Sequence, residues 1–247
     1  YSQTFTFNGG AQPWSSYQVS NLPTGLSITG NTANSVIISG TPLVSGAFNL
    51  NVSATDSSTG NGPYTIGQAF VLNVDAPTIT ITPASLPNGA VAASYSQTIS
   101  ASGGIGTYYY TRTAGTIPNG LTLSSAGVLS GIPTEGGNFN FTISATDESN
   151  FSASQSYSIN IAAPTIVLPT TNLPVGTQNQ VYSAPINPAT GGTAPYSYFV
   201  SAGALPSGLL VSKSGTISGT PTVFGNFNFT ITARDNSTGT GPYTASR

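Results

Sequence analysis

Hydrophobic and polar side chains alternate along several short runs of this sequence. In residues 139–145, Phe139, Phe141 and Ile143 fall on one side of an extended chain, and polar residues fall on the other. Residues 227–233 repeat this alternation. Because successive side chains of a β-strand point to opposite faces, the pattern predicts half-buried strands. No stretch of the sequence shows the 3.6-residue period of an amphipathic helix.

Proline and glycine interrupt these runs at intervals that suit short strands joined by tight turns. This spacing predicts an all-β fold made of two-layer, immunoglobulin-like sandwiches. For the middle third of the chain we expect strands over residues 78–82, 94–101, 108–114, 121–123, 128–130, 139–146 and 154–161.

The sequence also repeats itself. Three blocks share a Pro-x-Gly-Leu motif, then a Ser-Gly-x-Pro motif, then an alternating run that ends in aspartate. The motifs occupy residues 22–26, 117–121 and 205–209, then 39–42, 130–133 and 218–221, and the aspartates are Asp56, Asp147 and Asp235. A period of about 90 residues is that of a small independent domain. We therefore expect domains over 1–75, 76–162 and 163–247, the first without its opening strand and the third without its closing strand.

The junctions between these domains contain proline and no flexible tract. The chain passes through Pro77 and through Pro164 directly from one strand toward the next. Proline stiffens a linker, so we expect tandem domains arranged end to end as a rod within a longer array. An open alternative is that the two incomplete edges meet in different copies of the chain by strand-edge association.

Charge excludes several classes of function. The chain has four Lys and Arg residues, six Asp and Glu residues, and a net charge of -2. Such a chain offers no basic surface for nucleic acid and no polybasic segment for a membrane, and no apolar run is long enough to insert into one. It begins without the pattern of a signal peptide. We expect no nucleic-acid partner and no membrane insertion in this segment.

Catalysis is also disfavoured. The chain has no His and no Cys, which removes the usual general base, thiolate nucleophile and soft-metal ligands. The acids outside the repeated aspartate position are Asp75, Glu135 and Glu148. They fall on a junction, a turn and a loop, too far apart for a carboxylate pair. We therefore expect that the chain is not an enzyme.

The repeated motifs resemble a known family. The order Tyr95-Ser-Gln-Thr-Ile, Ile117-Pro-Asn-Gly-Leu and Gly127-Val-Leu-Ser-Gly-Ile-Pro is similar to the He-PIG type immunoglobulin-like repeat of bacterial and archaeal surface proteins. The resemblance covers essentially the whole chain and implies an extracellular, cell-surface location. The family serves as spacer in adhesins, surface proteins and secreted enzymes, so the resemblance fixes no single task. Its relatives include cadherin-type and dystroglycan-type domains, some of which bind calcium at their junctions.

Calcium is therefore one candidate ligand, although no cofactor is our primary expectation. The resemblance points to Asp56, Asp147 and Asp235, with Glu148 beside Asp147 and Asp75 at a junction. Calcium takes six to eight oxygen ligands, and the junctions lack the acidic run that would complete such a shell. The favoured interpretation is that each aspartate caps a turn by accepting backbone N–H bonds.

Surface glycans are a second candidate, because exposed aromatic rings can stack on sugars. Trp14, Tyr109 and Tyr196 lie on or near the third strand of their repeats. In the run Tyr108-Tyr109-Tyr110, alternation places Tyr109 on the face opposite to its neighbours. The favoured interpretation is core packing on one face and cross-strand pairing on the other.

Two modification signals carry less weight. Asn-x-Ser/Thr sequons occur at Asn51, Asn140, Asn150, Asn228 and Asn236, a frequency that chance explains in a chain so rich in Asn, Ser and Thr. Lys213 could form an isopeptide bond, but the other two repeats have no lysine, which favours a surface turn.

The sequence favours a non-catalytic structural spacer, stalk or fibre-forming segment of an extracellular surface protein. Neighbouring immunoglobulin-like domains are the expected partners. The alternative function is an adhesin or carbohydrate-binding module that uses exposed strand aromatics.

Overall fold

The structure is a computed structural model that describes all residues from 1 to 247. It contains 22 strands and no helix, which confirms the all-β prediction. None of its elements is a helix long and apolar enough to cross a membrane. Contacts within the chain define two compact units. The first holds residues 1–80, 102–108 and 146–152, and the second holds 81–101, 109–145 and 153–247. The expected domain boundaries stay a prediction, but each repeat forms sheets of its own, and one strand of the third repeat joins a sheet of the second.

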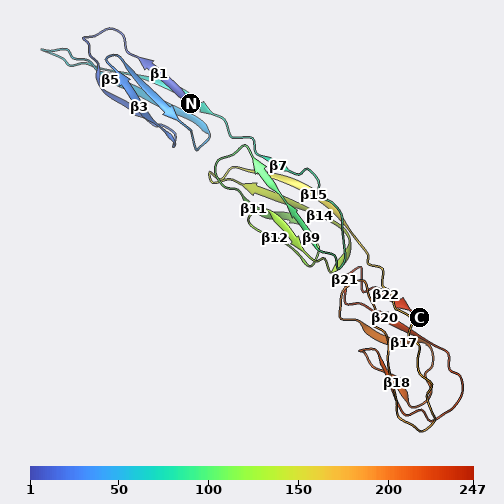
Figure 1. The fold of residues 1–247 in the computed structure, drawn as a ribbon. Helices are drawn as coiled ribbons and strands as arrows, with labels where there is room; N and C mark the ends of the chain where they lie inside the picture. The colour runs from blue at the N-terminus through green and yellow to red at the C-terminus, as the bar shows by residue number, and fades with distance from the viewer. The chain divides into compact units, whose positions relative to one another are not determined.

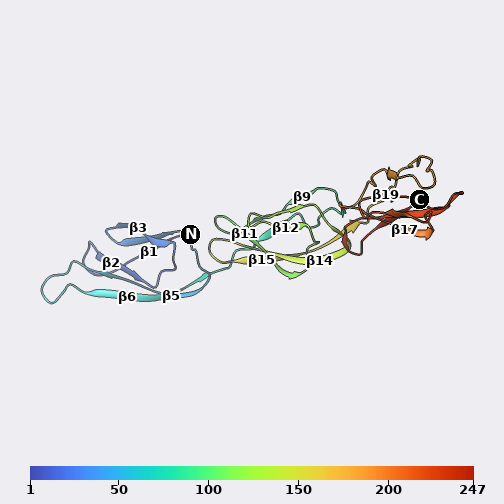
Figure 2. The same cartoon turned by 90° about the horizontal axis from the view of Figure 1, so that it is seen from below.

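The first repeat forms two three-stranded sheets, ordered β1-β4-β3 and β2-β5-β6. Figure 2 shows them as two layers, with β1 and β3 on one side and β5 and β6 on the other. Val36, Ile38, Leu50 and Val52 are buried between the layers. The strands are β1 (Ser2–Thr6), β2 (Ser15–Ser20), β3 (Leu26–Thr32), β4 (Ser35–Gly40), β5 (Gly46–Thr55) and β6 (Thr65–Val74).

The second repeat has a sheet of order β12-β13-β9 and a larger sheet that contains β11-β14-β15-β8, while β7 pairs with β10. The alternating runs predicted for residues 139–146 and 154–161 supply part of the core, and Ile99, Tyr110 and Leu129 from other segments are buried with them. The strands are β7 (Thr80–Thr82), β8 (Gly89–Ala90), β9 (Tyr95–Thr98), β10 (Ser100–Ser102), β11 (Tyr109–Gly115), β12 (Leu121–Leu123), β13 (Val128–Gly131), β14 (Glu135–Thr146) and β15 (Ser152–Ala162).

The third repeat forms the sheets β16-β19-β18 and β17-β20-β22, and one further strand, β21, pairs with β14 of the second repeat (Figure 1). Ile166, Tyr198, Ile231 and Ala233 are buried in its core. The strands are β16 (Tyr182–Pro185), β17 (Ser197–Gly203), β18 (Leu209–Val211), β19 (Thr216–Gly219), β20 (Phe229–Arg234), β21 (Thr238–Gly239) and β22 (Thr244–Ser246).

The two glycine motifs of each repeat meet in the fold. Gly25 and Gly40 both have positive φ, at +92° and +139°. A Cβ on Gly25 would lie 2.0 Å from the carbonyl oxygen of Thr41, and one on Gly40 would lie 2.1 Å from that of Gly25. Only glycine suits such positions. The corresponding glycines of the other repeats make the same approach, which explains why the motifs occur together.

Candidate functional site

An aspartate lies at the end of a core strand in each repeat. Asp56, Asp147 and Asp235 follow β5, β14 and β20, and their side chains are only 4 %, 2 % and 4 % exposed. The two-residue period explains this burial. The alanine two positions earlier in each repeat is fully buried, so the aspartate is directed to the same core-facing side. A buried carboxylate requires hydrogen-bond partners, and the loops provide them.

Four donors surround the Asp56 carboxylate. The hydroxyl of Ser58 donates to Oδ2 at 2.6 Å, and the N–H of Ala11 donates to the same oxygen at 3.3 Å. The N–H groups of Tyr64 and Ser58 donate to Oδ1 at 2.9 and 3.2 Å. This carboxylate therefore links the loop after β5 to the loop before β2.

Asp235 has the same arrangement. Its oxygens accept the N–H groups of Thr193, Tyr243 and Ser237 at 3.0, 2.7 and 3.3 Å, together with the hydroxyl of Ser237. In each of these repeats, the aspartate binds a backbone N–H more than 40 residues earlier in the chain, which fixes the loop before β2 in the first repeat and the loop before β17 in the third.

Asp147 accepts the N–H groups of Ile105, Ser149 and Phe151, each at 2.9 Å. The turn-capping interpretation of all three aspartates is thus confirmed by these hydrogen bonds.

Hydrogen bonding keeps two of these carboxylates charged to low pH. The Ser58 hydroxyl, followed by the Tyr64 N–H, lowers the pKa of Asp56 from 3.8 to about 2. For Asp235, burial acts to raise the pKa, but the bonds from Ser237, Thr193 and Tyr243 outweigh burial and lower it. Donors that stabilise a carboxylate anion have this effect in general.

The calcium candidates do not form a calcium site. The chain has no group of three or more His, Cys, Asp or Glu side chains that could hold a metal ion. Glu148 is exposed, and its Oε1 accepts the N–H of Thr107 at 3.0 Å. Asp75 is an exposed residue just after β6. A calcium ion needs several convergent oxygens, whereas the Asp147 oxygens already face N–H donors. These residues therefore do not fit a calcium ion.

Sequence reasoning missed the partners of these aspartates. A serine stands two positions after each aspartate, namely Ser58, Ser149 and Ser237, and this Asp-x-Ser repeat was visible in the sequence. The distant donors Ala11, Ile105 and Thr193 each follow or lie within a glycine-containing loop. Only the folded chain brings these loops to the aspartate.

The aromatic candidates differ in exposure. Tyr109 is 56 % exposed while Tyr110 is 6 % exposed, as the expected alternation requires. Tyr196 is half-buried, and its hydroxyl donates to the carbonyl oxygen of Gly191. Trp14 is only 6 % exposed, so its candidacy as a glycan-binding residue is wrong. Its ring packs in the interior and presents no face to a sugar. The expectation failed because Trp14 precedes β2 and turns inward beside Phe7, 5.6 Å between ring centroids.

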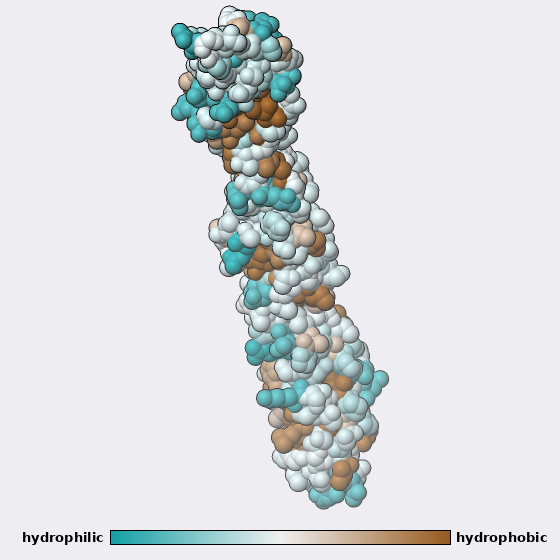
Figure 3. Space-filling view, turned by 90° about the vertical axis from the view of Figure 1, so that its left-hand side faces the viewer, coloured by the Kyte–Doolittle hydropathy of each residue, from teal (hydrophilic) through white to brown (hydrophobic).

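The modification candidates all lie at the surface. The sequon residues Asn51, Asn140, Asn150, Asn228 and Asn236 are exposed. Lys213 is exposed in the turn between β18 and β19. On the face drawn in Figure 3, hydrophobic residues form separate patches with scattered hydrophilic residues between them.

Repeats two and three are joined by a short parallel pairing of strands. β21 lies beside the start of β14, with Glu135 opposite Thr238 and Gly136 opposite Gly239. The N–H of Thr238 donates to the carbonyl of Thr134 at 2.7 Å, and the hydroxyl of Thr240 donates to that of Gly136 at 2.8 Å. The loop that Asp235 organises therefore forms this junction.

Gly136 permits this close approach. A Cβ at this position would lie 2.4 Å from the hydroxyl oxygen of Tyr243 and 3.2 Å from that of Thr240. A larger side chain at this position would have to displace the Tyr243 hydroxyl and disturb the hydrogen bonds of the junction.

Comparison with known proteins gives three matches to one family. A family model described as "Putative Ig domain" matches residues 1–75, 77–162 and 164–246. Among curated proteins, the serine-rich adhesin for platelets of Staphylococcus aureus strain MRSA252 is 34 % identical over 138 residues. That match covers 53 % of this chain and 10 % of the adhesin. The same adhesin from strain MSSA476 is matched over 6 % of its length. This chain thus spans a tenth or less of these relatives.

Solved structures show more distant likeness. An endo-fucoidan hydrolase of glycoside hydrolase family 107 has a TM-score of 0.40 and 20 % identity, over 100 % of this chain and 40 % of that chain. The protocadherin GammaB4 extracellular domain has a TM-score of 0.32 and 17 % identity, over 95 % of this chain and 44 % of that chain.

Proposed function

This chain belongs to the family described as "Putative Ig domain", and we propose that it is a non-catalytic spacer or stalk segment of an extracellular surface protein. The observation that carries the proposal is the junction between repeats two and three. There a β-strand pairing and side-chain hydrogen bonds join the two repeats. Two domains joined by a flexible linker would not form such hydrogen bonds with each other. A spacer that holds a fixed distance requires a joint of this kind.

Three further features support this role. The staphylococcal relative is by name an adhesin, and 34 % identity over 138 residues favours a surface location for this chain as well. In each repeat the buried aspartate accepts hydrogen bonds from the neighbouring loops and so has a structural role. Asp147 and Glu148 are adjacent, but their oxygens accept backbone N–H groups of nearby loops, as a loop-holding role requires.

The fixed joint can be tested by measuring a distance across it. The chain has no cysteine, so Thr122→Cys and Leu210→Cys provide two specific sites for spin labels. Both positions are exposed and lie on the equivalent strands β12 and β18. We expect one narrow distance distribution between the labels. Adding Gly136→Val should broaden it, because the new side chain meets Tyr243 and Thr240.

The matched control is Gly30→Val in the first repeat, where a Cβ meets only an ordinary contact 3.6 Å away. This variant should leave the distribution unchanged. A broad distribution in the chain without Gly136→Val would show that the joint is flexible and would contradict the spacer role.

Glycan recognition is a second candidate function, favoured by one observation. Tyr109 is 56 % exposed at the start of β11, and the staphylococcal relative is an adhesin. An exposed tyrosine face can stack on a sugar ring. If this function holds, binding of the chain to a glycan array should be specific and lost in Tyr109→Ser. Tyr64→Ser, which alters another exposed tyrosine, should retain it. If the chain binds no glycan specifically, glycan recognition is excluded and the spacer role remains.

A further inference from the structure

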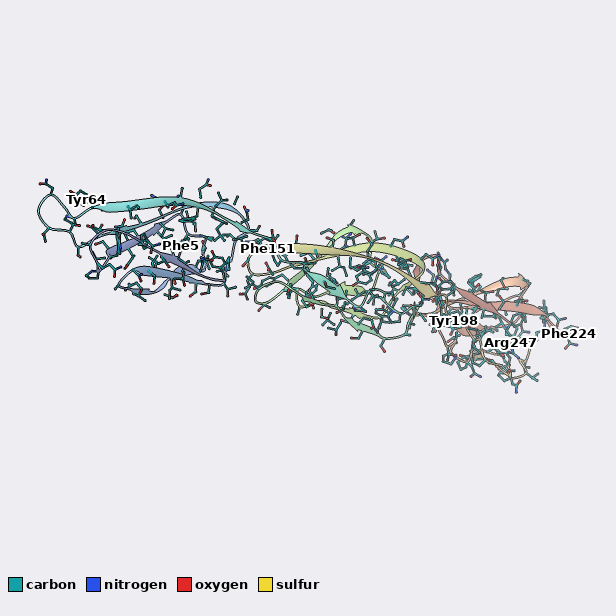
Figure 4. The ribbon with its side chains drawn as sticks, turned by 90° about the horizontal axis from the view of Figure 1, so that it is seen from above. Phe5, Tyr64, Phe151, Tyr198, Phe224 and Arg247 are labelled. Atoms are coloured by element: carbon teal, nitrogen blue, oxygen red, sulfur yellow. The ribbon has the colours of Figure 1, made fainter.

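The larger sheet of the second repeat has a shallow depression on its outer face. Its volume is about 370 Å³, and its lining includes Gly115, Asn140, Thr142, Ser156 and Ser158. These residues come from three strands, β11, β14 and β15, and β15 begins just after Phe151, which Figure 4 labels. Ligand pockets commonly have volumes of about 300–1,000 Å³, so the depression is large enough to hold a small molecule.

The depression follows from the two-residue period of these strands. Phe141 and Tyr157 point into the core and are 2 % and 3 % exposed, so their neighbours on β14 and β15 point outward. Gly115, at the end of β11, adds no side chain to this face. A Cβ there would lie 2.0 Å from the carbonyl oxygen of Asn140, so the close approach of β11 to β14 requires a glycine.

The outward side chains in the depression are neutral hydrogen-bonding groups. The hydroxyls of Thr142 and Ser156 lie 3.1 Å apart across the two strands. Asn140 and Ser158 are exposed, and the amide of the first and the hydroxyl of the second make no hydrogen bond within the chain. Hydroxyls and amides both donate and accept hydrogen bonds, as the ring hydroxyls of a sugar do. The depression therefore suits a polyhydroxylated ligand.

A positive charge lies at the same end of β11. The guanidinium of Arg112 donates a hydrogen bond to the carbonyl oxygen of Gly115, which lines the depression. Arg112 is exposed and forms no ion pair with any of the six acidic residues of the chain. A guanidinium has five N–H donors in a planar fork that matches a carboxylate. An anionic group on the ligand therefore has a partner here.

Neither of the other repeats combines these features. In the first repeat, the residues opposite Asn49 and Asn51 are Val71 and Ala69, where the second repeat has its two serines. Val71 is 64 % exposed, so apolar surface replaces a hydroxyl at that place. In the third repeat, Val200 occupies the position of the arginine. The combination of hydroxyls and a guanidinium is thus particular to the second repeat.

We propose that this depression binds an acidic sugar residue, with the sugar carboxylate at Arg112 and its ring hydroxyls at Asn140, Thr142 and Ser158. The proposal names a ligand class for the glycan recognition described above and so rests on that function. Tyr109 is not part of this site, because it lies at the opposite end of β11. Six residues of strand separate it from Gly115, a distance of about 20 Å.

The test titrates two disaccharides into the isotope-labelled chain and follows its NMR spectrum. Digalacturonate carries carboxylates, and digalactose is its neutral counterpart. We expect digalacturonate to shift the N–H signals of Asn140, Thr142 and Ser158, and to bind at least tenfold more tightly than digalactose. Arg112→Gln should weaken digalacturonate binding at least tenfold, because a charge-assisted hydrogen bond is lost, and leave digalactose binding unchanged. Arg234→Gln, which alters an exposed arginine at the end of β20, should retain both affinities.

A second variant tests the hydroxyls. Ser156→Ala combined with Ser158→Val copies the residues that the first repeat has at these places, so the sheet should keep its fold. We expect this variant to weaken the binding of both disaccharides at least tenfold. The matched control is Ser154→Ala, which removes an exposed hydroxyl of β15 outside the depression and should bind both as before.

Two results would overturn the proposal. The first is equal affinity for the two disaccharides that Arg112→Gln leaves unchanged, which would show sugar binding without selection for an acid. The second is the absence of any shift of the three N–H signals with digalacturonate. Specific binding to a glycan array would then show that glycan recognition itself holds at another site, and a silent array would show that it fails as well.

Discussion

The three buried aspartates are held by hydrogen bonds from backbone N–H groups and hydroxyls. Three or four N–H and O–H donors at each carboxylate replace the water that burial removes. The residue type and the capping role could be predicted from the sequence, because the alternating run continues into Asp147 and its equivalents. The donors could not, since Ile105 lies 42 residues from Asp147 and reaches it only in the folded chain.

Replacing Asp147 tests this role. Asp147→Asn keeps the shape but places an NH₂ group against N–H donors, so one or more of them loses its acceptor. We expect a loss of about 1–3 kcal/mol in the free energy of unfolding, the usual cost of an unsatisfied buried donor. Glu148→Gln, an exposed neighbour that retains an acceptor oxygen, should change it by less than about 0.5 kcal/mol. Denaturant titration of both variants measures the difference, and equal effects would contradict the role.

The lowered pKa values predict a pH dependence. Asp56 has a pKa of about 2 in the folded chain against 3.8 ordinarily, so the unfolded chain binds a proton first as pH falls. The stabilisation is therefore present above about pH 4 and is lost as pH falls toward 2. The unfolding midpoint should decline over this range, and less steeply in Asp56→Asn. Calorimetry between pH 5 and pH 2 checks it; a midpoint that rises with acidity would oppose the expected sign.

Among the elements, the longer strands follow directly from alternation, whereas the shortest do not. The expected strand at 121–123 is β12, and those at 139–146 and 154–161 lie within β14 and β15. β8 and β21 went unpredicted. Each has two residues and pairs in parallel with a distant partner, so neither leaves a periodic pattern in the sequence.

The glycine motifs permit a prediction at the same scale. Gly208 has a φ of +96°, and a Cβ there would lie 2.0 Å from the carbonyl oxygen of Thr220. Gly208→Ala should therefore destabilise the third repeat by more than Gly60→Ala destabilises the first. Gly60 also has a positive φ, but a Cβ at that position would have no atom within 4 Å. Gly60→Ala therefore measures the backbone strain alone, about 1–3 kcal/mol, without the clash that Gly208→Ala adds. Thermal unfolding of the two variants gives the comparison. Equal losses would show that the close approach to Thr220 is relaxed without cost.

At the scale of the whole molecule, low charge and the absence of an acidic cluster predict little response to divalent ions. The unfolding midpoint should be the same in millimolar calcium as in the presence of a chelator, because no group of three or more acidic side chains is available to bind the ion. Calorimetry with calcium and with chelator makes the measurement. A midpoint that rises with calcium would require a site assembled from backbone oxygens. Asp147→Asn should then abolish the rise if that carboxylate contributes.

The position of Trp14 has a practical consequence. It is the one tryptophan of the chain, it is 6 % exposed, and its indole nitrogen has no hydrogen-bond partner. Its fluorescence emission should be that of an indole in an apolar environment, and should move to longer wavelength only when the first repeat opens. The emission of this single residue thus reports the unfolding of one repeat, while circular dichroism reports all three.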